Sequence, residues 1–454
     1  MIKPLEISEF DTIVRKSDKY AQDGRYFYLE SDTFDEFETF VKEYGVSEEG
    51  ANAADFFSLG FKKNIGDTIT AKNYVGLVQL KNGYQIQILP KIQLGGSKLT
   101  SMQIFLRMLR SLKDFQGKIF TNADLKAERM NLYEVFISMY LQETRRLVKH
   151  GLKSAYVSQE DNLNYCKGKI LIPQHLKYNH SHKEKFYCVY DEYQINRAEN
   201  KLVKSTLLKL KELTESATNA KEINQLLTHF ELVDVSLNYE KDFSKVVIDR
   251  NTKDYDLLMR WSKVFLYNKS FSTFSGTVTS RTLLFPMEKL FESYVAREMR
   301  KTVPNDWRVS TQDRGYYLFD TPQPVFRLRP DIVVQIPNCP SVILDTKWKR
   351  LIPNPSKNYG ISQEDMYQMY AYSKKYKTSE IWLLYPYDSS MDEYKNVLFR
   401  SLEKNQITNV HVFMVDLANM EDSMGDLFEK IIENTSQHNV LSKYEIVSEL
   451  SEQR

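Results

Sequence analysis

The 454-residue sequence has only three cysteines, and no two of them form a CxxC pair. A zinc site built from paired cysteines is therefore excluded, and so few thiols suit a reducing compartment, so we expect a cytoplasmic protein. No apolar run approaches the length of a membrane span, and the N-terminus lacks the apolar core of a secretory signal. The absence of a GxxxxGK[ST] motif excludes a P-loop NTPase. Because the net charge is only +2, contacts with nucleic acid would have to come from local patches.

What the sequence does have is an apolar hairpin pattern with charged ends. Residues 332–334 and 342–344 are rich in β-branched side chains and flank a turn-like segment with two prolines, which predicts a β-hairpin. Asp345 and Lys347 lie two positions apart, so they project from one face, which Asp331 could reach from the neighbouring strand. Two carboxylates and an amine at one point suit metal-dependent cleavage of a phosphodiester. The alternative is an ordinary hairpin with a solvated Asp and Lys.

Two predicted helices flank this hairpin. Residues 283–295 carry apolar side chains at helical spacing, with Glu292 beside the apolar stripe and Glu288 one turn earlier as the competing metal-facing carboxylate. Around residues 365–372 a second helix places Gln368 and Tyr372 on one face. These two side chains could bind phosphate or brace the lysine, and the alternative is a helix packed by its aromatic residues. A further buried strand is predicted after this helix.

In this order of helix, strand, strand, helix and strand, residues 283–385 resemble the PD-(D/E)xK nuclease fold, in the variant with a Gln-x-x-x-Tyr helix after the lysine strand. Most of the chain between residues 74 and 385 is similar to the McrC family, the nuclease subunits of McrBC-type and LlaJI-type modification-dependent restriction systems. The segments that carry this resemblance are 74–78, 86–92, 150–152, 167–170, 200–204, 290–295 and 344–349, together with Tyr156.

The resemblance implies a metal-dependent endodeoxyribonuclease. Asp331, Asp345, the carbonyl of Thr346 and Glu292 would hold Mg²⁺, for which Mn²⁺ can substitute. Lys347 would position or activate the attacking water. Gln368 completes the expected catalytic set. The side chains that we expect to contact DNA, with a solvated or packed side chain as the alternative for each, are Arg329, Lys349, Arg350 and Tyr372.

The resemblance also implies a protein partner. In the family, the nuclease subunit docks its N-terminal part into the pore of a hexameric AAA+ NTPase (the McrB subunit), which hydrolyses GTP in the best-known systems and usually recognises the modified DNA. We expect docking through residues 74–92, with Lys81, Asn82 and Lys91 as candidate contacts. A surface hairpin that merely caps the N-terminal domain is the alternative. Dimerisation of the nuclease on DNA is a further arrangement to consider.

The sequence therefore predicts an α+β and α/β multidomain protein. Its expected parts are a strand-rich, partner-docking domain over residues 1–100, a mainly helical region over 101–265, a nuclease domain over 270–400 with a central mixed sheet flanked by helices, and a C-terminal extension over 401–454. The rival functions are a stand-alone nuclease of the same fold and a non-catalytic adaptor that stimulates a ring NTPase. The long region before the nuclease domain argues against the first rival. The joint presence of both aspartates and the lysine argues against the second.

Overall fold

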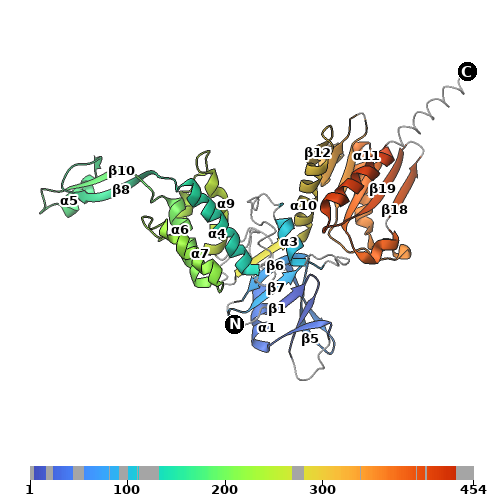
Figure 1. Ribbon diagram of the computed structural model, residues 1–454, viewed down its shortest axis with the longest axis horizontal. Coiled ribbons are helices and arrows are strands. Elements are labelled where there is room, and N and C mark those ends of the chain that lie inside the picture. The colour runs from blue at the N-terminus through green and yellow to red at the C-terminus, as the bar shows by residue number, and fades with distance from the viewer. Residues whose placement is uncertain are drawn as a thin grey trace, which may run out of the picture.

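The computed structural model describes a mixed α/β protein, and the predicted fold class is confirmed. Figure 1 shows two N-terminal sheets, a helical bundle that carries a projecting arm, and a mixed sheet flanked by helices. None of the helices in the described part of the chain has the length and apolarity that crossing a membrane requires. The residues described are 5–16, 24–43, 56–80, 82–91, 101–109, 111, 132–267, 281–337, 339–394, 396–403 and 406–435.

The N-terminal part consists of two four-stranded sheets. One has the order β1 (Leu5–Ser8), β7 (Gln85–Leu89), β6 (Tyr74–Gln79) and β11 (Arg281–Pro286). The other has the order β3 (Tyr26–Leu29), β2 (Thr12–Arg15), β5 (Gly66–Ala71) and β4 (Phe57–Lys62). Helix α1 (Ser31–Glu43) packs its buried phenylalanines against them. Strands β6 and β7 pair antiparallel as a hairpin.

Strand β11 joins the N-terminal sheet to the rest of the chain. It pairs with β6 over its whole length and leads directly into helix α10 (Met287–Thr302). At Gly76 a β-carbon would lie 1.8 Å from the carbonyl oxygen of Leu283, and the φ angle is +145°. Only glycine allows this close approach. Strand β11 therefore belongs to the N-terminal sheet and connects it directly to α10, the helix that begins the C-terminal part.

The middle part is a helical bundle. Its helices are α3 (Ser101–Leu109), α4 (Leu132–His150), α6 (Ala198–Leu213), α7 (Ala217–Thr228), α8 (Tyr239–Ser244) and α9 (Asp256–Tyr267), with a 3₁₀ turn, η4, at Lys253–Tyr255. Their apolar faces share one core with β6, β11 and α10. Between α4 and α6 the chain leaves the bundle as an arm, seen at the far left of Figure 1. The arm contains β8 (Ala155–Leu163), β9 (Lys169–Ile170), α5 (Ile172–Tyr178) and β10 (Phe186–Gln194).

The C-terminal part is built on a six-stranded mixed sheet. The strand order is β12 (Arg308–Thr311), β15 (Ile332–Gln335), β16 (Val342–Thr346), β17 (Glu380–Pro386), β19 (Gln406–Val415) and β18 (Val397–Glu403). Strands β16, β17 and β19 are parallel and the other pairings are antiparallel. The predicted hairpin is confirmed as β15 and β16. Smaller elements are β13 (Tyr317–Phe319), β14 (Val325–Arg327), η5 (Pro355–Gly360), η6 (Ser389–Tyr394) and a final helix over 420–435.

Two helices cover opposite faces of this sheet. Leu344 packs in the same core as α10, whereas Ile343 packs in the core that contains α11 (Gln363–Tyr376). Because side chains alternate along a strand, Asp345 and Lys347 follow Ile343 on the α11 side, and Thr346 follows Leu344 on the α10 side. The register of β16 therefore decides which helix faces each candidate site residue.

Candidate functional site

Asp331 and Asp345 lie at the same end of the β15–β16 hairpin. Asp331 immediately precedes β15, and its Oδ2 accepts hydrogen bonds from the backbone N–H of Thr346 at 2.8 Å and from the Thr346 hydroxyl at 2.7 Å. Asp345 is only 2% exposed at the end of β16. The hydrogen bonds from Thr346 therefore place the first carboxylate against the strand that carries the second.

Lys347 brings the strand and helix α11 together. Its Nζ lies 2.7 Å from Asp345 Oδ2 and donates to Gln368 Oε1 at 3.0 Å. The side-chain amide of Gln368 then donates to the hydroxyl of Tyr372 at 2.7 Å. The i, i+4 pair on α11 thus faces the lysine, and Gln368 contacts it directly.

The carboxylates of this cluster are difficult to ionise. Burial, and then the charge of Asp331, raises the pKa of Asp345 to about 7. The same two causes, in the same order, raise the pKa of Glu292 to about 7. Burial also raises the pKa of Asp331, although its bonds from Thr346 oppose this. Buried acidic groups that repel one another would be stabilised in their ionised form by a bound cation.

The ammonium of Lys347 is held in its charged form. Burial alone would lower its pKa, but the charges of Asp345, Asp365 and Asp331 outweigh burial and raise the pKa above its ordinary value. A lysine protonated in this way can donate hydrogen bonds and offset negative charge. It is not prepared to accept a proton from water.

Glu292 and Glu288 differ in their surroundings. Glu292 is partly buried on α10, accepts a hydrogen bond from Gln312 Nε2 at 2.6 Å, and lies close enough to Asp331 for the two charges to interact. Glu288 is exposed and accepts from Asn73 Nδ2 at 2.9 Å, although its charge also reaches Asp331. The geometry favours Glu292 as the third carboxylate of the cluster.

The oxygen atoms of these residues suit a hard divalent cation, but they are not arranged as a complete set of metal ligands. Nowhere in the described ranges do three or more His, Cys, Asp or Glu side chains gather closely enough to hold a metal ion. The three carboxylates are each engaged by a protein group, namely Thr346, Lys347 or Gln312. Binding Mg²⁺ would therefore require Asp345 to exchange its contact with Lys347 for the ion.

The candidate DNA contacts are of three kinds. Arg329 is exposed. Lys349 and Arg350 are exposed but paired, Lys349 with Asp365 at 2.9 Å and Arg350 with Asp388 at 2.6 Å. Tyr372 is buried and bonded to the site, so in this structure its hydroxyl supports the lysine rather than offering a surface to DNA.

The candidate docking residues lie in and near the β6–β7 hairpin. Lys81 is outside the described residues. The backbone N–H of Asn82 donates to Glu36 Oε1 of α1 at 2.9 Å, and the Lys91 ammonium pairs with Asp11 at 3.2 Å. Both contacts lie within the N-terminal part, so they favour the alternative that this hairpin caps its own domain.

Three residues of this region were missed by sequence reasoning. Asp365 pairs with Lys347 at 3.5 Å and with Lys349 at 2.9 Å, and its position three residues after the N-cap Ser362 was a signal that could have been used. Gln312 contacts Glu292, and Glu9 contacts Trp348. No sequence pattern marks either, because each reaches the site from a distant segment.

Known proteins are similar to this chain in sequence and in fold. The family described as McrBC 5-methylcytosine restriction system component matches residues 69–386. A chain from the assembly of Thermococcus gammatolerans McrB AAA+ hexamers with bound McrC is 18% identical with a TM-score of 0.65, and the alignment covers 95% of this chain and 100% of that one. A chain from the Thermococcus gammatolerans McrBC complex is 19% identical with a TM-score of 0.44, over 67% and 89% of the two chains. No curated protein matches.

Proposed function

The chain belongs to the family of McrBC 5-methylcytosine restriction system components, and from this membership we propose that it is the Mg²⁺-dependent DNA endonuclease subunit of such a system. We further propose that a hexameric AAA+ NTPase, with GTP as its nucleotide, activates the chain and is stimulated by it. A solved protein of the same fold is bound to McrB AAA+ hexamers, which supports the choice of partner.

One observation carries the nuclease assignment. Asp331, Asp345 and Lys347 meet at the end of an antiparallel pair of strands, and α11 holds the lysine through Gln368. A hairpin with a solvated Asp and Lys would not bury one carboxylate to 2% exposure, because burying a charge is costly unless the charge is paired or binds a metal. The cluster therefore supports phosphodiester hydrolysis better than it supports a purely structural hairpin.

Each group has a definite task in this proposal. Asp331, Asp345 and the Thr346 carbonyl, with Glu292, would hold Mg²⁺, or Mn²⁺ in its place, and the ion would supply Lewis-acid stabilisation of the charged phosphate. Lys347 donates a hydrogen bond to the attacking water or to the phosphate oxygens and offsets their developing charge. Gln368, which is fixed by its hydrogen bond to Tyr372, orients the Lys347 ammonium. Arg329 and, once released from Asp365, Lys349 bind the DNA backbone, and dimerisation on DNA would allow both strands to be cut.

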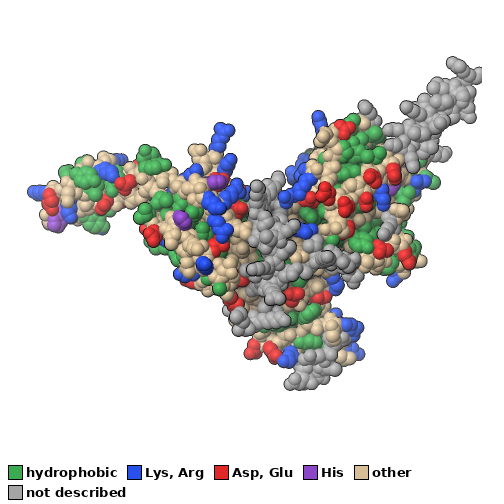
Figure 2. Space-filling view, in the orientation of Figure 1, with side chains coloured by type: hydrophobic (Ala, Val, Ile, Leu, Met, Phe, Trp, Pro, Cys, Tyr) green, Lys and Arg blue, Asp and Glu red, His purple; other side chains and the backbone are tan. Residues whose placement is uncertain are grey.

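The projecting arm is a stronger candidate for partner docking than the hairpin at Asn82. Its strands β8 and β10 each have nine residues and extend roughly 30 Å from the bundle at about 3.4 Å per residue. Figure 2 shows apolar side chains on its surface. The large exposed ones are Tyr156, Tyr165, Ile172, Leu176, Tyr178 and Tyr193, each at least 52% exposed. A narrow projection with so much apolar surface indicates a protein partner, and its shape suits the opening of a ring.

The function is tested by purifying the chain with and without the AAA+ protein encoded beside it, and by comparing Asp345→Asn with the unaltered chain. We expect Mg²⁺-dependent DNA cleavage only when partner and nucleotide are both present, and we expect Asp345→Asn to lose cleavage while it still stimulates the NTPase. The asparagine keeps the size of the side chain, so loss of activity with retained stimulation separates chemistry from folding.

Two other results would change the assignment. Cleavage by the chain alone, without nucleotide, would favour a stand-alone nuclease. NTPase stimulation without cleavage under any metal would favour a non-catalytic adaptor.

A further inference from the structure

Glu9 lies at the junction between the N-terminal sheets and the strand end that carries the site. It is only 1% exposed, although it is a carboxylate in the turn between β1 and β2. The indole N–H of Trp348 donates to both of its oxygens, at 3.0 and 3.1 Å, and the backbone N–H of Lys91 donates to Oε2 at 3.1 Å. A carboxylate buried so completely is costly unless it is hydrogen-bonded, and these hydrogen bonds offset part of that cost.

Trp348 directly follows Lys347. Its ring packs on Phe291 of α10, with centroids 5.4 Å apart, and the backbone N–H of Lys347 donates to Leu384 of β17 at 2.8 Å. The indole is therefore fixed on two sides, by ring packing within the C-terminal part and by Glu9 from the N-terminal part. A shift of Glu9 would move the hydrogen-bonded indole of Trp348, and Trp348 is joined directly to Lys347 by a peptide bond.

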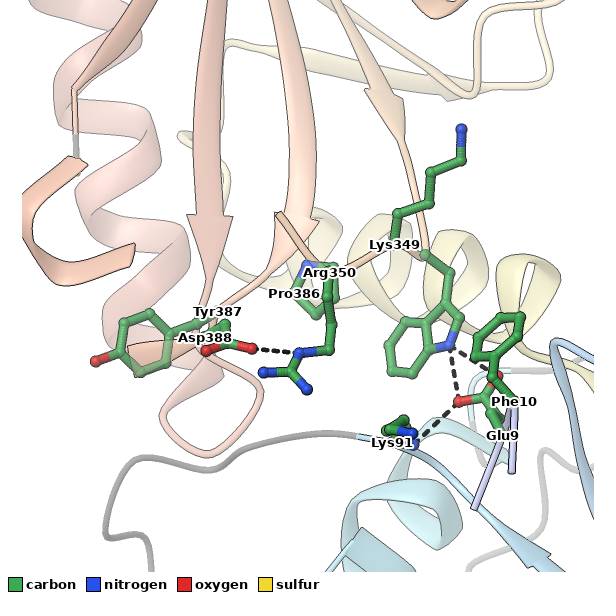
Figure 3. A pocket seen from close by; sticks show the side chains of 9 residues that line it. Glu9, Phe10, Lys91, Lys349, Arg350, Pro386, Tyr387 and Asp388 are labelled. Atoms are coloured by element: carbon green, nitrogen blue, oxygen red, sulfur yellow. Dashed lines mark hydrogen bonds and ion pairs between the residues drawn. The ribbon is translucent and has the colours of Figure 1, made fainter. Parts of the chain in front are cut away.

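The packing around this contact is incomplete. A cavity of about 270 Å³ lies beside it, between Glu9, Phe10 and Lys91 on one side and Trp348, Arg350 and Pro386 on the other. Figure 3 shows an indole ring hydrogen-bonded to Glu9, while Arg350 points to Asp388 on the side away from Glu9. Beside this cavity, the Trp348–Glu9 hydrogen bonds link the two parts directly.

A second link reaches the other side of the site. The Asn73 carbonyl, beside β6, accepts from the backbone N–H of Met287 at 3.1 Å, and the Asn73 side-chain amide donates to Glu288. The N-terminal sheets therefore contact the first turn of α10, which carries Glu292 one turn later, as well as the strand end that carries Lys347.

We propose that Glu9 is a positioning residue, which holds Trp348 so that Asp345, Thr346 and Lys347 lie in the geometry that binds metal and cleaves DNA. The N-terminal sheets then control the metal site, and a displacement of these sheets changes the alignment of the catalytic lysine. This inference rests on the proposed nuclease function and extends it to a part of the chain with no catalytic group of its own.

The test combines three variants and a matched control. Trp348→Phe removes the indole N–H and keeps the ring packed on Phe291, and Glu9→Ala removes the acceptor. Glu9→Gln keeps an acceptor oxygen that can occupy the Oε2 position, within reach of both donors. Trp307→Phe, at the Phe428 contact on the other end of α10, makes the same indole-to-phenyl change away from Glu9.

The first readout is Mn²⁺ binding to the full chain by calorimetry, with Asp345→Asn defining the signal of this site. We expect the dissociation constant to rise about tenfold in Trp348→Phe and in Glu9→Ala, the usual effect of removing a group that orients a metal ligand. The double variant should be no worse than the more affected single one, because both changes break one contact. Glu9→Gln should stay within about threefold of the unaltered chain, and Trp307→Phe should match it.

The second readout is the single-turnover cleavage rate of the complex with the AAA+ partner. This rate should fall in Trp348→Phe and Glu9→Ala and stay close to that of the unaltered chain in Glu9→Gln and Trp307→Phe. Unchanged Mn²⁺ affinity and cleavage in both Trp348→Phe and Glu9→Ala would overturn the positioning role. So would a Glu9→Gln variant as defective as Glu9→Ala. If Mn²⁺ affinity falls as expected but no chain cuts DNA, the nuclease function fails while the role of Glu9 stands. If Asp345→Asn binds Mn²⁺ like the unaltered chain, both proposals fail.

Discussion

Lys347 and Gln368 are joined by a hydrogen bond of 3.0 Å that connects β16 to α11 across the face of the sheet. The glutamine amide can accept from the lysine only while its NH₂ group points to Tyr372, which lies 2.7 Å away. The direction of the ammonium is therefore set by a helix residue four positions before a buried tyrosine. Lys347 also contacts Asp345. The hydrogen bond to Gln368 therefore competes with the carboxylate for the position of the ammonium.

We expect Gln368→Ala to slow cleavage by about tenfold without abolishing it, because the lysine keeps its charge and loses only its orientation. Single-turnover rates of the complex measure this effect. Tyr372→Phe should reproduce part of the defect, since the glutamine would lose the partner that fixes its amide. Gln363→Ala, on the exposed first turn of the same helix, is the control and should cut normally.

Lys347→Ala should bind Mn²⁺ and DNA and cut at least on the order of a hundredfold more slowly, as expected when a charge-stabilising donor is removed. Lys347→Arg should be nearly as slow, because the guanidinium cannot keep the distances to Asp345 and Gln368. Cleavage rate and DNA affinity must be measured separately. Loss of DNA affinity with an almost unchanged single-turnover rate would make Lys347 a phosphate anchor instead.

The strands and helices near the site could be predicted because their patterns are local. The apolar runs on either side of the Pro337–Pro340 turn specify the β15–β16 hairpin, and the period-2 alternation then places Asp345 and Lys347 on one face. The helical spacing of Gln368 and Tyr372 identified their shared face in the same way. Patterns of this kind predict on which face of its own strand or helix each side chain lies.

What the sequence did not reveal depends on contacts between distant segments. Glu9 and Trp348 are separated by 339 positions and meet only in the folded chain. The pairing of β11 with β6 likewise depends on the close approach at Gly76, which appears in sequence as an ordinary glycine. Residues 101–265 were predicted only as mainly helical, because the projection of the arm depends on where α4 and α6 end, and hydrophobic periodicity carries no such information.

Glu292→Gln should impair cleavage more than Glu288→Gln. Glu292 lies among buried groups, with its pKa raised to about 7 by burial and by Asp331, whereas Glu288 is exposed and bonded to Asn73. The measurement is the Mg²⁺ concentration that gives half-maximal cleavage, which we expect to rise about tenfold for Glu292→Gln and to change little for Glu288→Gln. The reverse order would make Glu288 the third carboxylate.

Shortening the arm should separate the two activities of the complex. Replacing residues 156–193 by a short Gly/Ser linker removes most of the exposed aromatic side chains of β8, α5 and β10 and leaves the core of α4 and α6 intact. We expect the partner's NTPase stimulation to disappear while the Mn²⁺ affinity of the chain stays unchanged. Full NTPase stimulation by this variant would return the docking role to the hairpin near Asn82, where the paired variant Asn82→Ala would then be decisive.

The stability of the chain should depend on pH through Asp345. Burial and the charge of Asp331 raise its pKa from 3.8 to about 7, so the folded chain binds this proton more tightly than the unfolded chain. The stabilisation is complete below the unfolded pKa and is lost as the pH rises through about 7. Without metal, the melting temperature should therefore fall between about pH 5.5 and pH 8. In Asp345→Asn the fall should be smaller, by roughly 2 °C or more.

Mg²⁺ should oppose this loss, because the ion binds only the ionised carboxylates. The increase in melting temperature on adding Mg²⁺ should accordingly be larger at about pH 8 than at about pH 6, and it should be absent in Asp345→Asn. Thermal unfolding of the two chains with EDTA and with Mg²⁺ at both pH values gives all the required comparisons. If both chains lost stability in parallel and Mg²⁺ stabilised them equally at both pH values, Asp345 would not be the group that couples protons to the metal.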